Sequence, residues 1–253
     1  MIHYHGTRLS GDNLANIRAY AGKHAMVSFA SHSCIETVAE VCQSFCIDNG
    51  AFSCWTRGEK FDIAAYARFI EKWYRHPACD WYAIPDVIDG KEQDNIAMRS
   101  EWRELCPDRA WCMGVPVWHM HESLKELQYL ALAHPRVAIG SSGQYSTIGN
   151  SIWWSRISEA MDAICDKNGR PKTKLHGMRM LDPTIFSALP LSSADSTNVA
   201  RNAGIDSAWK GTYIPKSNET RAAIMMERIE SHCSAARWSG ETSGIQQNLG
   251  LFG

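Results

Sequence analysis

The chain has 253 residues, 45% of them hydrophobic, and a formal net charge of −1. This length suits one large α/β domain, and the balanced charge excludes nucleic-acid binding through an overall basic surface, although a local basic groove remains compatible with it. The nine cysteines lack the paired CxxC spacing of a zinc ribbon, which favours reduced thiols over a disulfide framework. No run approaches the ~18 apolar residues of a membrane span, and the amino terminus lacks the regions of a signal peptide. We therefore expect a soluble, cytoplasmic protein.

Short apolar runs alternate with helix-like segments along the chain. The expected strands are Ile2–Tyr4, Ala25–Phe29, Phe45–Asp48, Trp81–Ile84, Val115–Trp118, Val137–Ile139, Leu175–Met178, Leu191–Asp195 and Trp209–Ile214. The expected helices are Gly11–Tyr20, Ile35–Gln43, Ile63–Tyr74, Gln93–Leu105, Ser123–Ala133, Ile152–Asp166, Ser196–Asn202 and Glu219–Arg237.

This alternation, repeated about eight times, predicts a single-domain α/β protein, a (β/α)8 TIM-like barrel. Because there are eight or nine strand-like runs, one of them must lie outside the barrel. The barrel domain is expected to span residues 1–238. Residues 239–253 are rich in Gly, Ser and Gln and are expected to form a flexible tail.

Three aspartates stand at the carboxyl ends of expected strands: Asp48, Asp86 and Asp195. In a barrel these ends meet at one rim, where active sites are built. An aspartate there can act as a nucleophile, as a general base, or as a hydrogen-bond acceptor for a heterocycle. A lone strand-end aspartate is more often a helix N-cap, and Asp195 followed by Ser196 also fits that role. Three of them on one rim favour chemistry.

The turns beside these aspartates supply the expected substrate-binding residues. They are Asn49, Gly50, Phe52, Trp118, His119, His121, Ser141, Ser142, Gly143, His176 and Ser196. Glycines in the turn from Gly140 to Gly143 would let backbone N–H groups approach a ligand. Trp118 or Phe52 would stack on a flat base. The alternative for the ten tryptophans is a large aromatic core, and this is the expected role of Trp153 and Trp154.

The histidines allow a second interpretation. His3 and His5, together with His119, His121, His176 and Asp195, resemble the ligands of metal-dependent amidohydrolase barrels. Side chains two residues apart on a strand share one face, so both can reach one ion. That family also expects a lysine or carboxylate bridge on a middle strand, and the sequence places none there. The principal interpretation therefore includes no metal.

The ordered motifs resemble those of the tRNA-guanine transglycosylase superfamily. Asp48-Asn-Gly-Ala-Phe52 resembles its Asp-Ser-Gly-Gly-Phe segment, and Pro85-Asp86 resembles its second base-reading aspartate. Ile139–Gly143 is similar to its Gly-Gly-Leu segment, His176–Met178 to the strand before the nucleophile, and Ser193–Ser196 to the segment with the nucleophilic aspartate. The resemblance covers roughly 60% of the chain and is greatest to the DpdA-like branch, which acts on DNA.

Two departures from this family matter. Only Cys233 and His232 stand where the tRNA enzymes carry three closely spaced cysteines and a histidine, so we expect no C-terminal zinc subdomain and no tRNA-docking module. Val117–His121 replaces the glutamine-glycine segment that reads the base. The base should therefore differ from that of the tRNA enzymes.

The resemblance implies an enzyme that cleaves the N-glycosidic bond of a base flipped out of DNA. Asp195 would be the nucleophile or electrostatic stabiliser, and Asp48 and Asp86 would hold the departing base. Attack by water would make the protein a glycosylase that removes modified bases from phage DNA, the outcome we favour, in a context of phage defence. Attack by a free 7-deazaguanine base would make it a transglycosylase. DNA is the expected partner and no cofactor is expected; a non-catalytic binding barrel is the third alternative.

Overall fold

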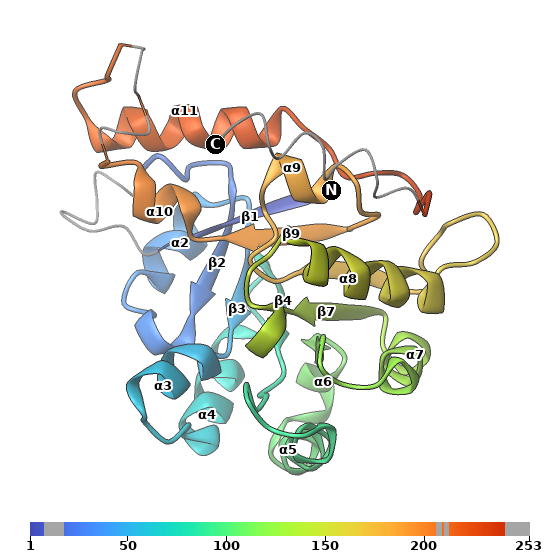
Figure 1. Ribbon diagram of the computed structural model, residues 1–253. Helices are drawn as coiled ribbons and strands as arrows, with labels where there is room; N and C mark the ends of the chain where they lie inside the picture. The colour runs from blue at the N-terminus through green and yellow to red at the C-terminus, as the bar shows by residue number, and fades with distance from the viewer. Residues whose placement is uncertain (8–17, 206–208, 210–212, 241–253) are drawn as a thin grey trace.

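The computed structural model describes residues 1–7, 18–205, 209 and 213–240. These residues form an α/β fold in which nine parallel strands build one nearly closed barrel, with helices packed around it (Figure 1). The strands are β1 (Ile2–Gly6), β2 (His24–Ser28), β3 (Ser44–Asp48), β4 (Cys79–Ala83), β5 (Gly114–Val115), β6 (Val117–His119), β7 (Arg136–Gly140), β8 (Lys174–Gly177) and β9 (Ser193–Ser196).

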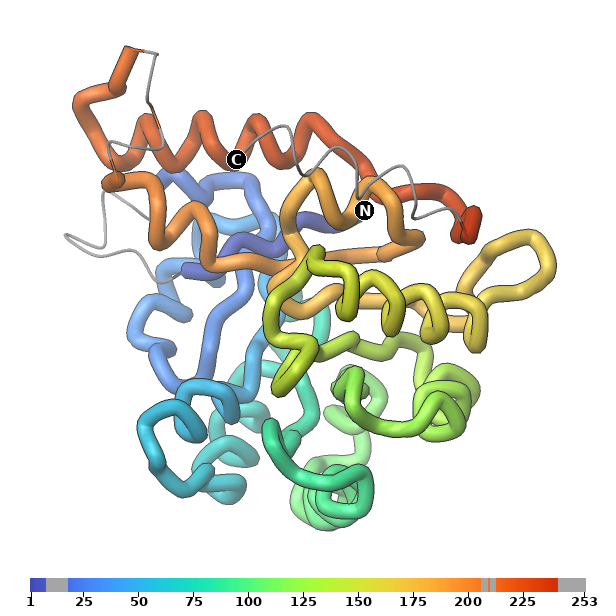
Figure 2. The backbone as a smooth tube through the Cα atoms, in the orientation of Figure 1, coloured from blue at the N-terminus to red at the C-terminus, as the bar shows by residue number. Residues whose placement is uncertain are grey.

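The strands follow one another around the barrel in the order β5-β4-β3-β2-β1-β9-β8-β7-β6. Because β1 pairs with both β2 and β9, strands from the two ends of the sequence lie side by side (Figure 2). The edge strands β5 and β6 are separated in sequence only by Pro116, which has no N–H to donate. β5 pairs with β4 and β6 pairs with β7, so the two edges of the sheet meet at this proline.

The described helices are α2 (Ile35–Val41), α3 (Ala51–Arg57), α4 (Ile63–Trp73), α5 (Glu92–Leu105), α6 (Asp108–Trp111), α7 (Leu124–Ala133), α8 (Ser151–Ile164), α9 (Pro183–Phe186), α10 (Asn198–Asn202) and α11 (Asn218–Glu230), with 3-10 turns η1 (Phe29–Ser31) and η2 (Gly143–Tyr145). The short helices α3, α6 and α9 were not predicted from the sequence. α11 ends at Glu230, earlier than the predicted Arg237. Among these described segments, no helix is long and apolar enough to span a membrane.

Parts of three predicted segments lie outside the described residues. Most of the helix predicted over 11–20 and half of the strand predicted over 209–214 belong to these parts, as do residues 241–253 of the predicted tail. Trp209, Tyr213 and Ile214 are described, and none of the three is part of a strand.

Alternation along each strand divides the core into two layers. The inner cluster fills the barrel and contains Tyr4, Met26, Cys46, Trp81, Ala83, Val115, Val117 and Ala138. The outer cluster, between the sheet and the helices, contains the fully buried Trp102, Trp118, Trp153 and Trp154. Packing of Trp153 and Trp154 on α8 confirms the role predicted for them. The inner cluster fills the lumen below the carboxyl ends of the strands.

A polar cluster fixes the C-terminal helix against the outside of the barrel. His5 Nε2 lies 3.0 Å from Glu230 Oε1, and Lys23 Nζ lies 2.6 Å from Glu230 Oε2. His3 Nε2 lies 3.0 Å from the His232 carbonyl oxygen. Since Tyr4 faces the lumen, its neighbours in the strand face outwards. The His3 and His5 pair therefore supports α11.

Candidate active site

One cavity of about 470 Å³ opens at the carboxyl ends of the strands. Eight of the residues predicted for the site line it: Asp48, Asn49, Phe52, Asp86, His119, Ser141, Ser142 and Asp195. Further lining residues are Gly6, Thr7, Met26, Ser28, Ser31, Ser53, Ile88, Val117, Gly140, Met178, Arg179, Thr197 and Arg201. Met26 and Val117 also belong to the inner core cluster, which therefore forms the apolar floor of the cavity.

The three predicted carboxylates lie around this single cavity. Asp48 is the last residue of β3, Asp86 follows β4, and Asp195 lies in β9. Burial raises the pKa of Asp48 to about 6, and the charges of Asp195 and Asp86 add to the rise. The Ser28 hydroxyl and the Gly50 N–H, 3.2 Å from Oδ2, act in the opposite direction. Asp48 can therefore hold or release a proton near neutral pH.

Among the described residues, the side chain of Asp195 is bonded through one of its two oxygens. Its Oδ1 accepts hydrogen bonds from the Arg179 backbone N–H (2.9 Å) and from His176 Nε2 (3.2 Å). The other ring nitrogen of His176 lies 2.9 Å from Ser193 Oγ. Burial lowers the pKa of His176 despite the opposing effect of Asp195, so the ring is a neutral donor. Within the described chain no hydrogen-bond donor reaches Asp195 Oδ2, which leaves that oxygen for a ligand.

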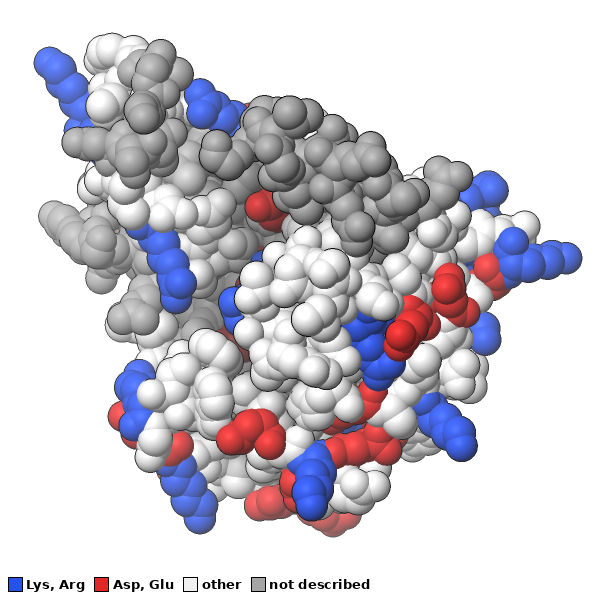
Figure 3. Space-filling model, viewed as in Figure 1, with Lys and Arg blue, Asp and Glu red and all other residues white. Residues whose placement is uncertain are grey.

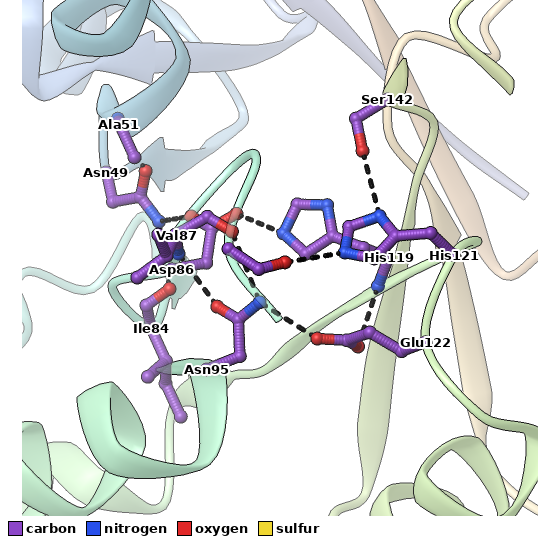
Figure 4. Close-up of polar contacts among 11 residues, drawn as sticks. Asn49, Ala51, Ile84, Asp86, Val87, Asn95, His119, His121, Glu122 and Ser142 are labelled. Atoms are coloured by element: carbon purple, nitrogen blue, oxygen red, sulfur yellow. Dashed lines mark hydrogen bonds and ion pairs between the residues drawn. The ribbon is translucent and has the colours of Figure 1, made fainter. Parts of the chain in front are cut away.

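Asp86 belongs to a hydrogen-bonded wall on the opposite part of the rim, drawn in Figure 4. Its Oδ1 accepts from Asn49 Nδ2 (2.7 Å), and its Oδ2 lies 2.7 Å from His119 Nε2. Asn49 also donates to the Ile84 carbonyl (2.8 Å) and accepts from the Ala51 N–H (2.8 Å). Asn49 therefore orients Asp86, and its own polar atoms are occupied by protein groups.

Arg179 is a site residue that the sequence reasoning missed. It has φ of 62°, a left-handed conformation that costs a non-glycine residue energy. Its guanidinium carbon lies 5.6 Å from the centre of the Phe52 ring. Phe52 is 44% exposed beside Trp55, which is 47% exposed, so aromatic faces are available next to the cavity. The sequence did give one indication of its role: Arg179 directly follows a predicted strand, so it was expected to lie near the rim.

Several predicted ligand-binding residues lie behind the cavity wall. Trp118 is fully buried in the outer core, where its Nε1 donates to the Ser123 carbonyl (3.0 Å). Its neighbour His119 faces the lumen, and alternation along β6 turns Trp118 away. His176 is fully buried next to Trp81, with ring centres 4.6 Å apart, and supports Asp195 from below. Neither ring is on the cavity surface.

The other four residues lie around the rim, Ser196 at the end of β9 and the others in the connections between strands and α-helices. Gly50 has φ of 79° and precedes α3, where a Cβ atom would come within 2.8 Å of the Ala30 nitrogen. Ser196 Oγ accepts a hydrogen bond from the N–H of Asn198, the first residue of α10 (3.0 Å). His121 Nε2 lies 2.9 Å from the Gly90 carbonyl. Gly143 begins η2, beyond the lining residues.

The ligand set of the metal interpretation is not assembled in the described residues. No group of three or more His, Cys, Asp or Glu side chains lies there in an arrangement that could hold a metal ion. His3 and His5 face α11 outside the barrel, whereas His176 and Asp195 face the lumen. The two sets cannot share one ion.

A more open hollow of about 730 Å³ lies at the opposite end of the barrel. Its lining includes Pro135, Lys174 and Pro190, near the starts of β7, β8 and β9, and contains no carboxylate. The three predicted carboxylates therefore all lie at the other rim, the end at which barrels of this kind carry their active sites.

Comparison with known proteins adds little to this description. No protein-family model matches the chain, and no curated protein matches it. A solved structure described as "Structural study of Project ID from Aquifex aeolicus VF5" aligns over 90% of each chain, with a TM-score of 0.46 and 10% sequence identity. At this level of similarity, the match supports no argument about function.

Proposed function

We propose that this protein cleaves the N-glycosidic bond of a modified base in DNA, acting as a DNA glycosylase. The supporting observation is that three carboxylates in different environments line one cavity of about 470 Å³. This volume lies within the range of small-molecule sites and suits a nucleoside. Carboxylates whose environments differ can divide the roles of nucleophile and proton donor between them.

In this proposal Asp195 acts at the sugar. Its Oδ1 is fixed by His176 and the Arg179 N–H, which orients Oδ2 towards C1′ of a bound nucleotide. As the bond to the base breaks, positive charge develops at C1′, and Oδ2 either bonds to that carbon or stabilises the charge. Water then attacks C1′ and leaves an abasic site.

Asp48 supplies the proton. With a pKa of about 6 it is partly protonated near neutral pH, and it lies on the same cavity wall as Asn49 and Phe52. Proton transfer to the leaving base removes the need to expel an anion. The resulting carboxylate can then take a proton from the attacking water, which returns the site to its starting state.

The rim offers contacts suited to a nucleic acid. Phe52 and Trp55 present exposed rings on which a base could stack, and the lining residues Arg179 and Arg201 could pair with phosphates. On the face shown in Figure 3, basic and acidic side chains are interspersed and form no continuous basic surface. Binding would therefore depend on this local group of residues.

The finer parts of the proposal follow from the same features. We read β5 and β6 as one strand interrupted by Pro116, which would complete a (β/α)8 barrel. The order of Asp48, Asp86 and Asp195 around it supports a distant relationship to the tRNA-guanine transglycosylase superfamily, in its DpdA-like branch. A cytoplasmic enzyme acting on incoming phage DNA would suit this chemistry.

The test is to incubate the protein with unmodified DNA and with hypermodified phage DNA. Released bases would be measured by mass spectrometry, and alkali-labile sites by gel electrophoresis. Base release without an added acceptor supports excision, whereas release only when 7-deazaguanine is supplied indicates exchange. Asp195→Asn should abolish release. Asp182→Asn is the matched control, because Asp182 is an exposed N-cap outside the cavity and asparagine caps equally well.

A further inference from the structure

Both carboxylate oxygens of Asp86 are already occupied by protein donors. Asn49 Nδ2 lies 2.7 Å from Oδ1 and His119 Nε2 lies 2.7 Å from Oδ2, and the side chain is buried. Each of these oxygens could accept a second hydrogen bond, but Asn49 and His119 already hold the carboxylate in place within the wall. A base that displaced either partner would leave a buried polar group unsatisfied, which is costly.

His119 has one polar atom without a partner. Its Nδ1 is buried and makes no hydrogen bond in the described structure, while Nε2 is held by Asp86 (Figure 4). Buried ring nitrogens normally have partners, so an unpartnered one at a cavity needs an explanation. The residue itself is only 2% exposed, and its backbone N–H donates to Glu122 Oε2 (3.0 Å).

Gly140 lies directly beside this atom. A Cβ atom at position 140 would lie 3.2 Å from His119 Nδ1 and 3.0 Å from Val117 Cγ1. Ala138, two residues earlier in β7, faces the lumen, so such a Cβ would also point inwards. Gly140 and His119 both line the cavity. Any side chain at position 140 would therefore press against Nδ1, and glycine leaves this nitrogen uncovered by a side chain from β7.

We infer that His119 reads the base: its Nδ1–H donates a hydrogen bond to an acceptor atom on the base, such as a ring carbonyl oxygen, while Asp86 only positions the histidine. The inference rests on the proposed function for the identity of the ligand as a nucleobase. It goes beyond that function by naming the atom that selects the base and the complementary group on the base.

The surroundings of His119 favour the protonated ring. Burial alone would lower its pKa, but the hydrogen bond and charge of Asp86, with the charge of Glu122, outweigh burial and raise it. Arg99, on α5, opposes this rise, and the His121 ring stacks on His119 with centres 5.5 Å apart. With Nε2 bonded to Asp86, a protonated ring presents Nδ1 as a donor, whereas a neutral ring would present it as an acceptor.

The wall behind His119 is rigid. Asn95 donates to Glu122 Oε1 (2.8 Å) and accepts from the Val87 N–H (2.7 Å), which ties α5 to the loops after β4 and β6. Asn95 and Glu122 are both buried. A donor fixed in this way discriminates between ligands, because it cannot turn to suit a base with a different pattern of donors and acceptors.

The experiment measures binding of three purines that differ in the group at position 6; hypoxanthine also carries a proton on N1, where purine and adenine have an acceptor nitrogen. Hypoxanthine presents an oxygen acceptor there, purine presents neither group, and adenine presents an amino donor. Below the pKa of His119, hypoxanthine should bind about ten- to a hundredfold more tightly than adenine, with purine between them. At a pH above that pKa the preference between hypoxanthine and adenine should reverse. The ¹⁵N resonance of His119 Nδ1, assigned with His119→Gln, should shift on binding hypoxanthine.

Gly140→Ala tests the geometry without removing the histidine. The added methyl group should block Nδ1 and reduce the discrimination to less than about threefold. Gly114→Ala is the matched control, since its Cβ would meet neighbours at 2.9–3.0 Å and yet lies away from the cavity. This control should keep the full preference. If Gly140→Ala keeps it as well, or if Nδ1 does not respond to hypoxanthine, the assignment is overturned.

The two proposals fail in different ways. If no DNA yields a free base but Nδ1 responds to hypoxanthine as expected, the cavity binds a base and the glycosidic chemistry is wrong. If bases are released while Nδ1 gives no response and the three purines bind equally, the chemistry stands and the role of His119 is wrong.

Discussion

Two clusters of histidines and carboxylates lie on opposite sides of the same barrel wall. Outside, Glu230 has both oxygens occupied, one by His5 and one by Lys23. Inside, Asp195 lines the cavity with one oxygen bonded to His176 and the Arg179 N–H, and the other has no donor in the part of the chain that the structure describes. The residue types are similar, and the alternation along a strand decides which side they face. A fully paired carboxylate fixes a helix, whereas a half-paired one can act on a ligand.

The largest expected effect concerns the half-paired carboxylate. Asp195→Asn should reduce base release by about a thousandfold or more while leaving the melting temperature nearly unchanged, because it removes the charge that acts at C1′ and keeps the shape. Single-turnover assays on hypermodified DNA, with melting curves, would measure both effects. Full activity in this variant would rule out its assigned role.

The next effect separates proton donation from charge stabilisation. Asp48→Asn should reduce the rate by about 10²–10⁴-fold, the usual contribution of general acid–base catalysis. In the wild-type protein the chemical step should slow as pH rises through about 6, since the protonated form of Asp48 is the active one. The variant should lose this dependence. If the rate instead rises through the same pH range, the ionised form is the active one and Asp48 acts as a general base.

The same variant should also change stability. The pKa of Asp48 is raised in the folded state from its ordinary 3.8 to about 6, so the folded protein binds the additional proton and loses stability as pH rises between these values. Asp48→Asn removes this penalty. Its melting temperature should exceed that of the wild type at pH 7, and the difference should shrink towards pH 4. A lower melting temperature at pH 7 would contradict the burial described for this carboxyl.

Outside the barrel the expected effect is on stability alone. The pKa of Glu230 falls to about 2: burial raises it, but the hydrogen bonds from His5 and Lys23 outweigh burial. A lowered carboxyl pKa stabilises the fold above the ordinary value near 4.5, and this contribution disappears as pH falls towards 2. Glu230→Gln should therefore cost about 2–3 kcal/mol at pH 7 and little near pH 2, with activity unchanged.

Denaturant titrations at several pH values would measure this cost. Glu227→Gln provides the control, because Glu227 contacts the same lysine with a side chain that is 70% exposed. Its effect should stay below about 1 kcal/mol. If both substitutions lowered the free energy of unfolding by the same amount, the burial of Glu230 would contribute nothing to stability.

The smallest expected effect is at Arg179. Arg179→Gly should relieve the left-handed backbone and leave stability the same or slightly higher, because glycine adopts this conformation freely at a cost in unfolded-state entropy. It should weaken DNA binding several-fold. The slope of the logarithm of the binding constant against the logarithm of the salt concentration should also become shallower, by the amount that one phosphate contact contributes. Binding measured at several salt concentrations would show whether the guanidinium contacts the DNA backbone.

The sequence predicted the strands and the positions of the carboxylates well, since both follow from local patterns. Asp48, Asp86 and Asp195 stand at strand ends, and parallel strands bring such ends to one rim. The orientation of individual side chains was harder to predict. Successive side chains of a strand point to opposite faces of the sheet, so an error of one residue in the alternation moves a side chain from the lumen to the outside. Trp118 was therefore expected in the cavity, but it packs in the outer core.

Long-range partners were beyond the reach of local patterns. Nothing in the sequence near His119 indicates that Asp86 holds its ring, or that Asn95, on α5, braces Glu122 behind it. The left-handed conformation of Arg179 is likewise imposed by the surrounding fold. These features define which atoms are free for a ligand, and they required the structure.

The central claim is that the cavity carboxylates break a glycosidic bond. The most direct measurement mixes protein in excess over hypermodified phage DNA and counts free bases and abasic sites in the same sample. We predict equal amounts of both with the wild-type protein, and neither with Asp195→Asn. DNA that is bound yet stays intact at every protein concentration would contradict the claim.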